Sequence, residues 1–167
     1  MSALDSFRVM AQYNRWMNER IYAVCAKISD AERKRDRGAF FKSIHGTLNH
    51  LLLGDRVWLG RFVDRPFVVA SLDQELYADF DTLRAERAAT DAEIIDYVGA
   101  LDEATIEGDL RYTSIVNPEE RVIRLRYALL HFFNHQTHHR GQATTLIKQA
   151  GEEPGVTDLM WMPGLAP

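Results

Sequence analysis

The chain has 167 residues, a length that suits one domain with one hydrophobic core and excludes two separate catalytic domains. Its 46% hydrophobic and 26% charged residues are ordinary for a globular protein, which excludes a disordered or fibrous chain. The formal net charge of −4 argues against a nucleic-acid partner, because binding to a phosphate backbone requires a basic surface.

The sequence also carries no membrane or secretion signal that we recognise. No apolar run reaches the roughly 20 residues that span a bilayer, and residues 1–10 lack the basic-then-apolar pattern of a secretory signal. We therefore expect a cytoplasmic protein with no membrane partner. The single cysteine, Cys25, lies on an apolar helical face with Ile21 and Ile28, so we interpret it as a packing residue.

The first half of the chain predicts two long helices. Apolar residues recur with the helical period from Leu4 to Ile28, which indicates a first helix of about 25 residues. A charged connection follows at 27–40 and suits a loop or a short helix. The second helix is predicted from Phe40 to Val63. It has too many apolar positions for one solvated face, so we expect it to be largely buried before Pro66 ends it.

The second half predicts two more helices and an irregular segment between them. Phe80–Leu101 is amphipathic and contains a capping-box pattern at 90–93, so it forms either one helix, which we favour, or two collinear pieces. Residues Gly108–Val122 alternate around the turn signal Asn117-Pro118, which predicts a hairpin or an extended excursion. A fourth helical pattern runs over Leu125–Ala150 until Gly151 ends it.

These segments define the expected fold. Four long amphipathic segments without a convincing sheet predict an all-α, antiparallel four-helix bundle over residues 1–167, with a long connection between the third and fourth helices. The tail at 151–167 is expected to pack Met160 and Trp161 on the body of this single domain.

Histidines are concentrated on two of the predicted helices. The second helix holds His45 and His50, and the fourth holds His131, His135, His138 and His139. Bundles build metal sites from side chains that converge from facing helices, so this concentration favours a metal site in the core.

The helical wheel selects a pair on the fourth helix. At about 100° per residue, His139 lies near the centre of the apolar face and His135 at its edge, whereas His131 and His138 fall further round. The spacing His-x-x-x-His puts two imidazoles one helical turn apart, which suits one metal ion. Two core histidines that hydrogen-bond without metal would have the same spacing.

Local volume favours His50 as the third ligand. Gly46 and Gly54 flank it at i−4 and i+4 and would leave room for an imidazole and its ligand. His45 lies closer to polar neighbours and looks like a hydrated or capping residue.

Three neutral imidazoles would leave a divalent ion its full charge and at least one position for water or substrate. We expect a divalent transition metal, zinc or nickel first, with iron, cobalt or copper as alternatives. The sequence contains neither a His-Glu-x-x-His motif nor a paired-carboxylate spacing, so the catalytic acid or base stays unknown.

Two amides are candidates to support the metal site. Asn14 falls on the apolar face of the first helix, where it would hydrogen-bond a ligand imidazole, a substrate or the backbone of a neighbouring helix. Gln142 follows His138 and His139 by one turn and would orient a ligand or a metal-bound water, unless it lies in solvent. We interpret Arg140 as an interface or surface residue.

The chain resembles a known family at these residues. The segments YNRWMNERIY (13–22), SIHGTLNHLLLGDRVWLGRF (43–62) and LLHFFNHQTHHRGQATTLIKQAG (129–151) are similar to the DinB-like, or DinB/YfiT, metalloprotein superfamily. The resemblance implies a four-helix bundle, often a homodimer, in which a His-x-x-x-His pair and a third histidine bind a divalent metal. On this sequence that pattern falls on His50, His135 and His139.

The resemblance also suggests a class of activity. Some relatives are S-transferases or isomerases that use a low-molecular-weight thiol, and many are grouped as metal-dependent hydrolases without an assigned substrate. We therefore expect a metal-dependent enzyme that acts on a small molecule. The alternatives are a non-catalytic protein that binds a metal or small ligand, and a plain bundle whose surfaces carry the function.

Overall fold

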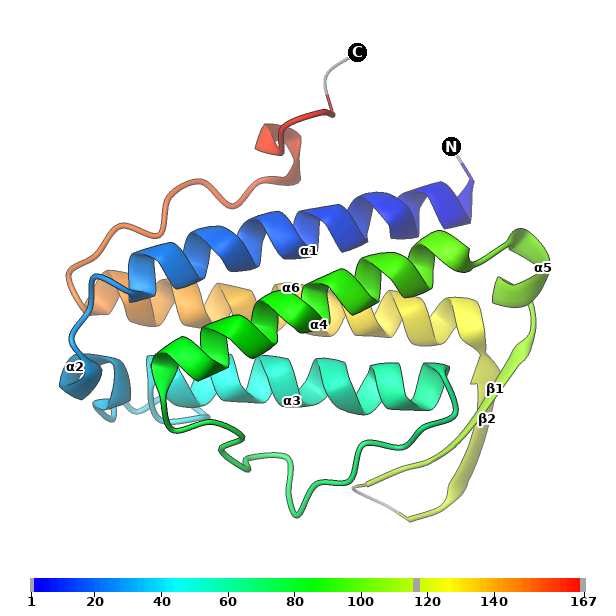
Figure 1. Ribbon diagram of the computed structural model, residues 1–167, viewed down its shortest axis with the longest axis horizontal. Helices are drawn as coiled ribbons and strands as arrows, with labels where there is room; N and C mark the ends of the chain where they lie inside the picture. The colour runs from blue at the N-terminus through cyan, green and yellow to red at the C-terminus, as the bar shows by residue number, and fades with distance from the viewer. Residues whose placement is uncertain (1, 116–117, 166–167) are drawn as a thin grey trace.

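Four long helices form a bundle in the computed structural model, which describes residues 2–115 and 118–165 (Figure 1). These helices are α1 (Ala3–Cys25), α3 (Ile44–Phe62), α4 (Phe80–Ala100) and α6 (Leu125–Gln149). The main neighbours are α1 with α4 and α3 with α6, and each of these pairs is antiparallel (Figure 1). The predicted all-α four-helix bundle is confirmed.

Two long connections complete the topology. Helices α3 and α4 run in the same direction, so residues 63–79 must return along the length of the bundle (Figure 1). The sequence did not predict this return. The expected long connection between the last two long helices is present at 101–124 and contains a short helix, α5 (Glu103–Ile106), and an antiparallel hairpin.

The hairpin lies at one end of the bundle, and the remaining short elements lie in the connection after α1 and in the tail (Figure 1). Strand β1 (Asp109–Thr113) pairs with β2 (Glu120–Arg124) in the predicted hairpin, although Asn117 of the expected turn lies outside the described residues. The charged connection after α1 contains helix α2 (Asp30–Lys34), and a single 3₁₀ turn, η1 (Leu159–Trp161), lies in the tail.

Side-chain caps mark where three of the four long helices begin, and α6 has none. Ser2 and Asp5 form a capping box at α1, Ser43 caps α3 and Asp79 caps α4. The predicted capping box at 90–93 is wrong, because α4 continues through it and the Thr90 hydroxyl donates to the Glu86 carbonyl at 2.8 Å. Helix α4 is therefore one piece, as favoured.

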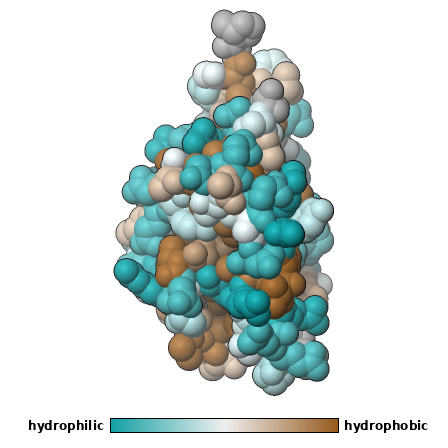
Figure 2. All heavy atoms as spheres, turned by 90° about the vertical axis from the view of Figure 1, so that its right-hand side faces the viewer, coloured by the Kyte–Doolittle hydropathy of each residue, from teal (hydrophilic) through white to brown (hydrophobic). Residues whose placement is uncertain are grey.

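The core is apolar and includes the cysteine. Helix α3 is buried over most of its surface, as its composition predicted. Cys25 is fully buried, and this burial raises the pKa of its thiol to about 12, in agreement with a packing role. Figure 2 shows separate apolar patches among polar side chains at the end of the molecule where the hairpin lies.

The tail contacts the body through a residue other than those predicted. Met160 and Trp161 are 82% and 69% exposed, whereas Met162 is buried against the core. The expectation that Met160 and Trp161 pack on the body is wrong, because the 3₁₀ turn directs the following residue inward instead. Within the described part of the chain, no helix is both long and apolar enough to cross a bilayer.

Candidate metal centre

Helices α3 and α6 bring three histidines together. One ligand atom from each of His50, His135 and His139 lies within 4.8 Å of the others. The Nε2 atoms of His50 and His139 are 3.2 Å apart, and the ring centres of His135 and His139 are 4.3 Å apart. Helix α3 thus supplies one imidazole and the antiparallel helix α6 supplies two, and the three meet at a common point.

A backbone carbonyl and an aromatic ring orient His50. Its Nδ1 lies 2.9 Å from the carbonyl oxygen of Leu72, in the 63–79 connection. Because a carbonyl only accepts, Nδ1 donates the hydrogen and Nε2 keeps its lone pair toward the cluster. The ring of Phe41 stacks on the imidazole at a centre-to-centre distance of 3.7 Å.

Gln142 orients His139 in the way expected for a supporting amide. Its Oε1 accepts from Nδ1 of His139 at 2.8 Å, which leaves Nε2 of that ring free to bind a metal. The amide nitrogen of Gln142 lies 3.2 Å from Nε2 of His138, an exposed histidine outside the cluster. The two contacts fix the orientation of the amide.

We expect Gln142→Ala to lower the affinity for divalent metal by about 10–100-fold, because His139 loses the acceptor that sets its tautomer. Isothermal titration with zinc or nickel measures the change. Thr144→Ala, on the exposed side of the same helix, is the control and should bind as the wild type does. Equal affinity in the Gln142 variant would contradict this supporting role.

Gly54 accommodates the ring of His135. A Cβ atom at position 54 would lie 2.8 Å from Cε1 of that imidazole, closer than real side-chain contacts allow. At position 46 the added atom would instead meet the backbone carbonyl of Phe41. The expectation that both glycines make room for His50 is therefore wrong, because each gives space to a different neighbour.

We expect Gly54→Ala to displace His135 and lower metal affinity by about tenfold or more, comparable to the loss of a supporting contact. Gly141→Ala is the matched control, since its added Cβ has no neighbour within 4 Å and only raises helix propensity. Metal titration of both variants, with circular dichroism to verify folding, measures the difference. An alanine at 54 that bound metal normally would contradict the packing argument.

The environment keeps all three imidazoles neutral. Burial lowers the pKa of His50 to about 4. Burial and the neighbouring histidines lower the pKa of His135 to about 3, and burial lowers that of His139. Nδ1 of His135 is buried without a hydrogen-bond partner among the described residues. Neutral nitrogens that converge in this way fit a divalent transition metal.

Asn14 does not support the metal centre. Its amide nitrogen donates to Asp91 at 2.8 Å, and its oxygen accepts from the guanidinium of Arg140. Two of the partners predicted for Asn14, a ligand imidazole and the backbone of a neighbouring helix, are therefore wrong, because Asp91 and Arg140 occupy its amide. Arg140 is also buried rather than at the surface, because Asn14 and the ring of Tyr13 surround its guanidinium.

These contacts belong to a buried ionic network that joins all four long helices. Arg87 forms ion pairs with Asp55 at 2.6 Å and Asp91 at 2.9 Å, and Gln136 donates to Asp55 at 3.0 Å. This network was not predicted from the sequence. The available signal was the pair Gln136 and Arg140, which repeats the four-residue spacing of the ligand histidines one position further along α6.

His45 also differs from its expectation. The side chain is fully buried rather than hydrated, and its Nε2 lies 2.8 Å from the carbonyl oxygen of Tyr77. It therefore attaches the end of the 63–79 connection to α3. This separate partner agrees with the choice of His50 over His45 for the cluster.

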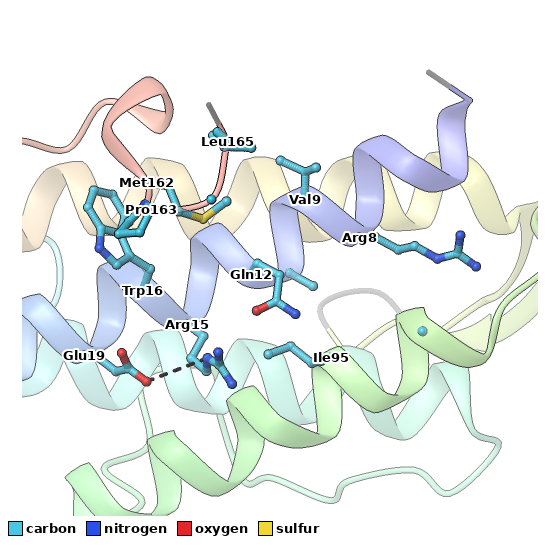
Figure 3. Close-up of a pocket in the computed structure, with 13 residues that line it drawn as sticks. Arg8, Val9, Gln12, Arg15, Trp16, Glu19, Ile95, Met162, Pro163 and Leu165 are labelled. Carbon is cyan, nitrogen blue, oxygen red and sulfur yellow. Dashed lines mark ion pairs between the residues drawn. The ribbon is translucent and has the colours of Figure 1, made fainter. Parts of the chain in front are cut away.

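A separate groove of about 620 Å³ lies on the far side of α1, between α1, α4 and the tail (Figure 3). Trp16, Ile95 and Met162 supply its apolar walls, and Arg15 and Glu19 form an ion pair of 3.7 Å along the α1 side. None of the three clustered histidines lines this groove, so it is distinct from the candidate metal centre.

Comparisons with known proteins agree with this architecture. The DinB family model matches residues 1–166. The chain is 26% identical over 156 residues to Protein DinB of Bacillus subtilis strain 168, covering 88% of this chain and 87% of that protein. The crystal structure of a DinB-like protein from Bacillus cereus ATCC 10987 has the same fold, with a TM-score of 0.66, 17% identity and coverage of 92% and 95%. Because the family model extends over nearly the whole sequence, the chain belongs to the DinB family.

Proposed function

We propose that this protein is a metal-dependent enzyme that acts on a small molecule, as a hydrolase or as an S-transferase that uses a low-molecular-weight thiol. His50, His135 and His139 would hold a divalent transition metal, with zinc or nickel the first candidates. The observation that carries this proposal is the convergence of three neutral imidazoles on one point.

The donor set suits catalysis better than a structural role. Structural zinc sites are usually closed by four protein ligands, whereas three histidines leave a position for water or substrate. When bound, such an ion polarises a substrate and lowers the pKa of a coordinated water or thiol toward 7. The protein orients its ligands through Leu72 and Gln142, and Phe41 shields one face of His50 from water.

The experiment requires protein purified without an affinity tag. Elemental analysis gives the bound metal, and metal-loaded protein is then assayed with ester and amide substrates and with several low-molecular-weight thiols against a panel of electrophiles. Turnover in the wild type that His135→Ala lacks supports the proposal. Absence of metal from both proteins, even after incubation with zinc or nickel, would refute it.

A second candidate is a protein that binds a metal or small ligand without catalysis. One observation favours it: among the described residues, no carboxylate hydrogen-bonds to the clustered histidines, and the buried acids Asp55 and Asp91 pair with Arg87 instead. Stoichiometric metal without turnover on any substrate would support this candidate.

We also propose a homodimer in the cytoplasm, which the resemblance to the DinB-like superfamily supports. Light scattering coupled to gel filtration measures the molar mass. A monomer at micromolar concentration would refute the dimer.

A further inference from the structure

Arg61, near the end of α3, carries a guanidinium that forms no ion pair with any acid in the described part of the chain. Its Cζ atom lies 4.5 Å from the ring centres of both Trp58 and Tyr112, which are themselves 5.4 Å apart, so the cation packs on two adjoining aromatic rings. Burial lowers the pKa of this guanidinium, and among the described residues no carboxylate pairs with it. Nearby Arg111 differs, because it forms an ion pair with Glu120 at 3.3 Å.

A partly buried cation that packs on two adjoining aromatic rings is a suitable receptor for an oxyanion. The rings reduce contact with water and fix the plane of the guanidinium, whose N–H groups match a carboxylate or phosphate in two-point hydrogen bonds. Arg61 also lines a cavity of about 290 Å³, together with the acids Asp64 and Glu120. Neither acid forms an ion pair with Arg61, and Glu120 pairs with Arg111 instead.

Arg61 lies on the same side of α3 as the candidate metal centre. We use the name α3–α6 strip for the residues at three- and four-residue spacing on the facing sides of these helices. On α3 the strip contains His50, Gly54, Trp58 and Arg61, and on α6 it contains His139, His135 and His131.

The contacts across the strip are continuous. The ring centres of His50 and His139 are 4.5 Å apart, Gly54 adjoins His135, and Trp58 lies 5.0 Å from His131. His131 in turn lies 5.9 Å from His135. Imidazole and indole rings therefore connect the metal centre to the cation.

We propose that Arg61 binds the anionic group of the small-molecule substrate or thiol whose reacting group lies at His50, His135 and His139. This inference rests on the proposed function. Gly54, beside His135, and Arg61 are seven residues apart, which is two helical turns or about 10 Å. The expected ligand therefore has a carboxylate or phosphate at one end and the reacting group at the other. An apolar body of about 10 Å joins the two ends.

The first arm of the test uses the cobalt-loaded protein. Thiolate coordination to cobalt(II) changes its absorption, which gives dissociation constants for 8-mercaptooctanoic acid and 8-mercapto-octan-1-ol. We expect the acid to bind about tenfold more tightly than the alcohol in the wild type, the effect of one charged hydrogen-bonded contact. Arg61→Met should remove the difference, and Arg111→Met should keep it, since Arg111 lines the same cavity but already has a partner.

The second arm uses metal-free protein, so that it does not depend on the proposed function. Octanoate, octyl phosphate and octanol are titrated while nuclear magnetic resonance follows the indole N–H of Trp58. Both anions should shift this signal at concentrations about tenfold lower than octanol does, and only when Arg61 is present. The tighter of the two anions identifies carboxylate or phosphate as the ligand group.

The outcomes separate the two proposals. Failure to load cobalt counts against the metal-dependent function alone, and the metal-free arm then decides the role of Arg61. Equal binding of anions and octanol in the metal-free wild type, or a preference that Arg61→Met retains, would overturn the assignment of Arg61.

Discussion

His139→Ala is expected to lower the affinity for divalent metal by more than about 100-fold, beyond the effect of losing a supporting residue. His139 contributes one of the three nitrogens of the cluster, and its Nε2 faces that of His50 at 3.2 Å. Elemental analysis after dialysis should give about one ion per chain in the wild type and almost none in the variant.

The matched control for this variant is His131→Ala. His131 lies on the same helix one turn before His135 but outside the cluster, so its removal should leave the metal content unchanged. Circular dichroism should show the same helix content in all three proteins. Equal metal content in wild type and His139→Ala would contradict the three-histidine site.

The second large effect concerns stability: Arg87→Met is expected to reduce the free energy of unfolding by about 3–5 kcal/mol. Arg87 is 2% exposed, and its guanidinium pairs with both Asp55 and Asp91. Removing it leaves two buried carboxylates without their cation. Urea unfolding measures the change, and Arg84→Met, at an exposed position of α4, should change it by less than about 0.5 kcal/mol.

The loss in Arg87→Met should also depend on pH. Burial already raises the pKa of Asp55 and Asp91, and Arg87 is the largest influence that opposes it, ahead of hydrogen bonds from Gln136 and Asn18. Its removal therefore raises both pKa values further. The folded variant then binds protons more tightly than the unfolded chain, so the destabilisation should be smaller at pH 5 than at pH 8. A loss below about 1 kcal/mol at pH 8 would show that the network contributes little, since breaking a buried pair normally costs several times more.

The fold could be predicted from the sequence because long apolar periodicity is a local signal. The four long helices lie within a few residues of their expected positions, and the alternation before Leu125 indicated the hairpin. The parallel arrangement of α3 and α4 could not be predicted in this way, since it depends on which faces pack together and not on any single segment. The prediction that Met160 and Trp161 pack on the body was wrong for a different reason. One 3₁₀ turn is too short for periodicity to indicate which residue lies inward.

The residues of the candidate site likewise fall into two groups: those that a local sequence pattern indicates, and those whose contacts only the tertiary structure shows. Wheel geometry selected His135 and His139 because both lie on one helix. The wheel was indecisive for His50, which local volume and the family resemblance selected. Asn14 was correctly placed on a buried face but given the wrong partner, because a wheel does not show which distant residue a buried polar side chain meets. Arg140 was wrongly placed at the surface, because the wheel of its own helix does not show that Asn14 of another helix covers it. Their partners come from helices far apart in the sequence, and only the tertiary structure joins them.

The contact between His50 and Leu72 has a consequence for evolution within such proteins. The acceptor is a main-chain oxygen, which every amino acid possesses, so substitution at position 72 need not disturb the imidazole. Inserting or deleting a residue between 63 and 79 would move that oxygen away while all three histidines stayed in place. Variation in loop length could thus alter metal preference among relatives whose aligned ligands look identical.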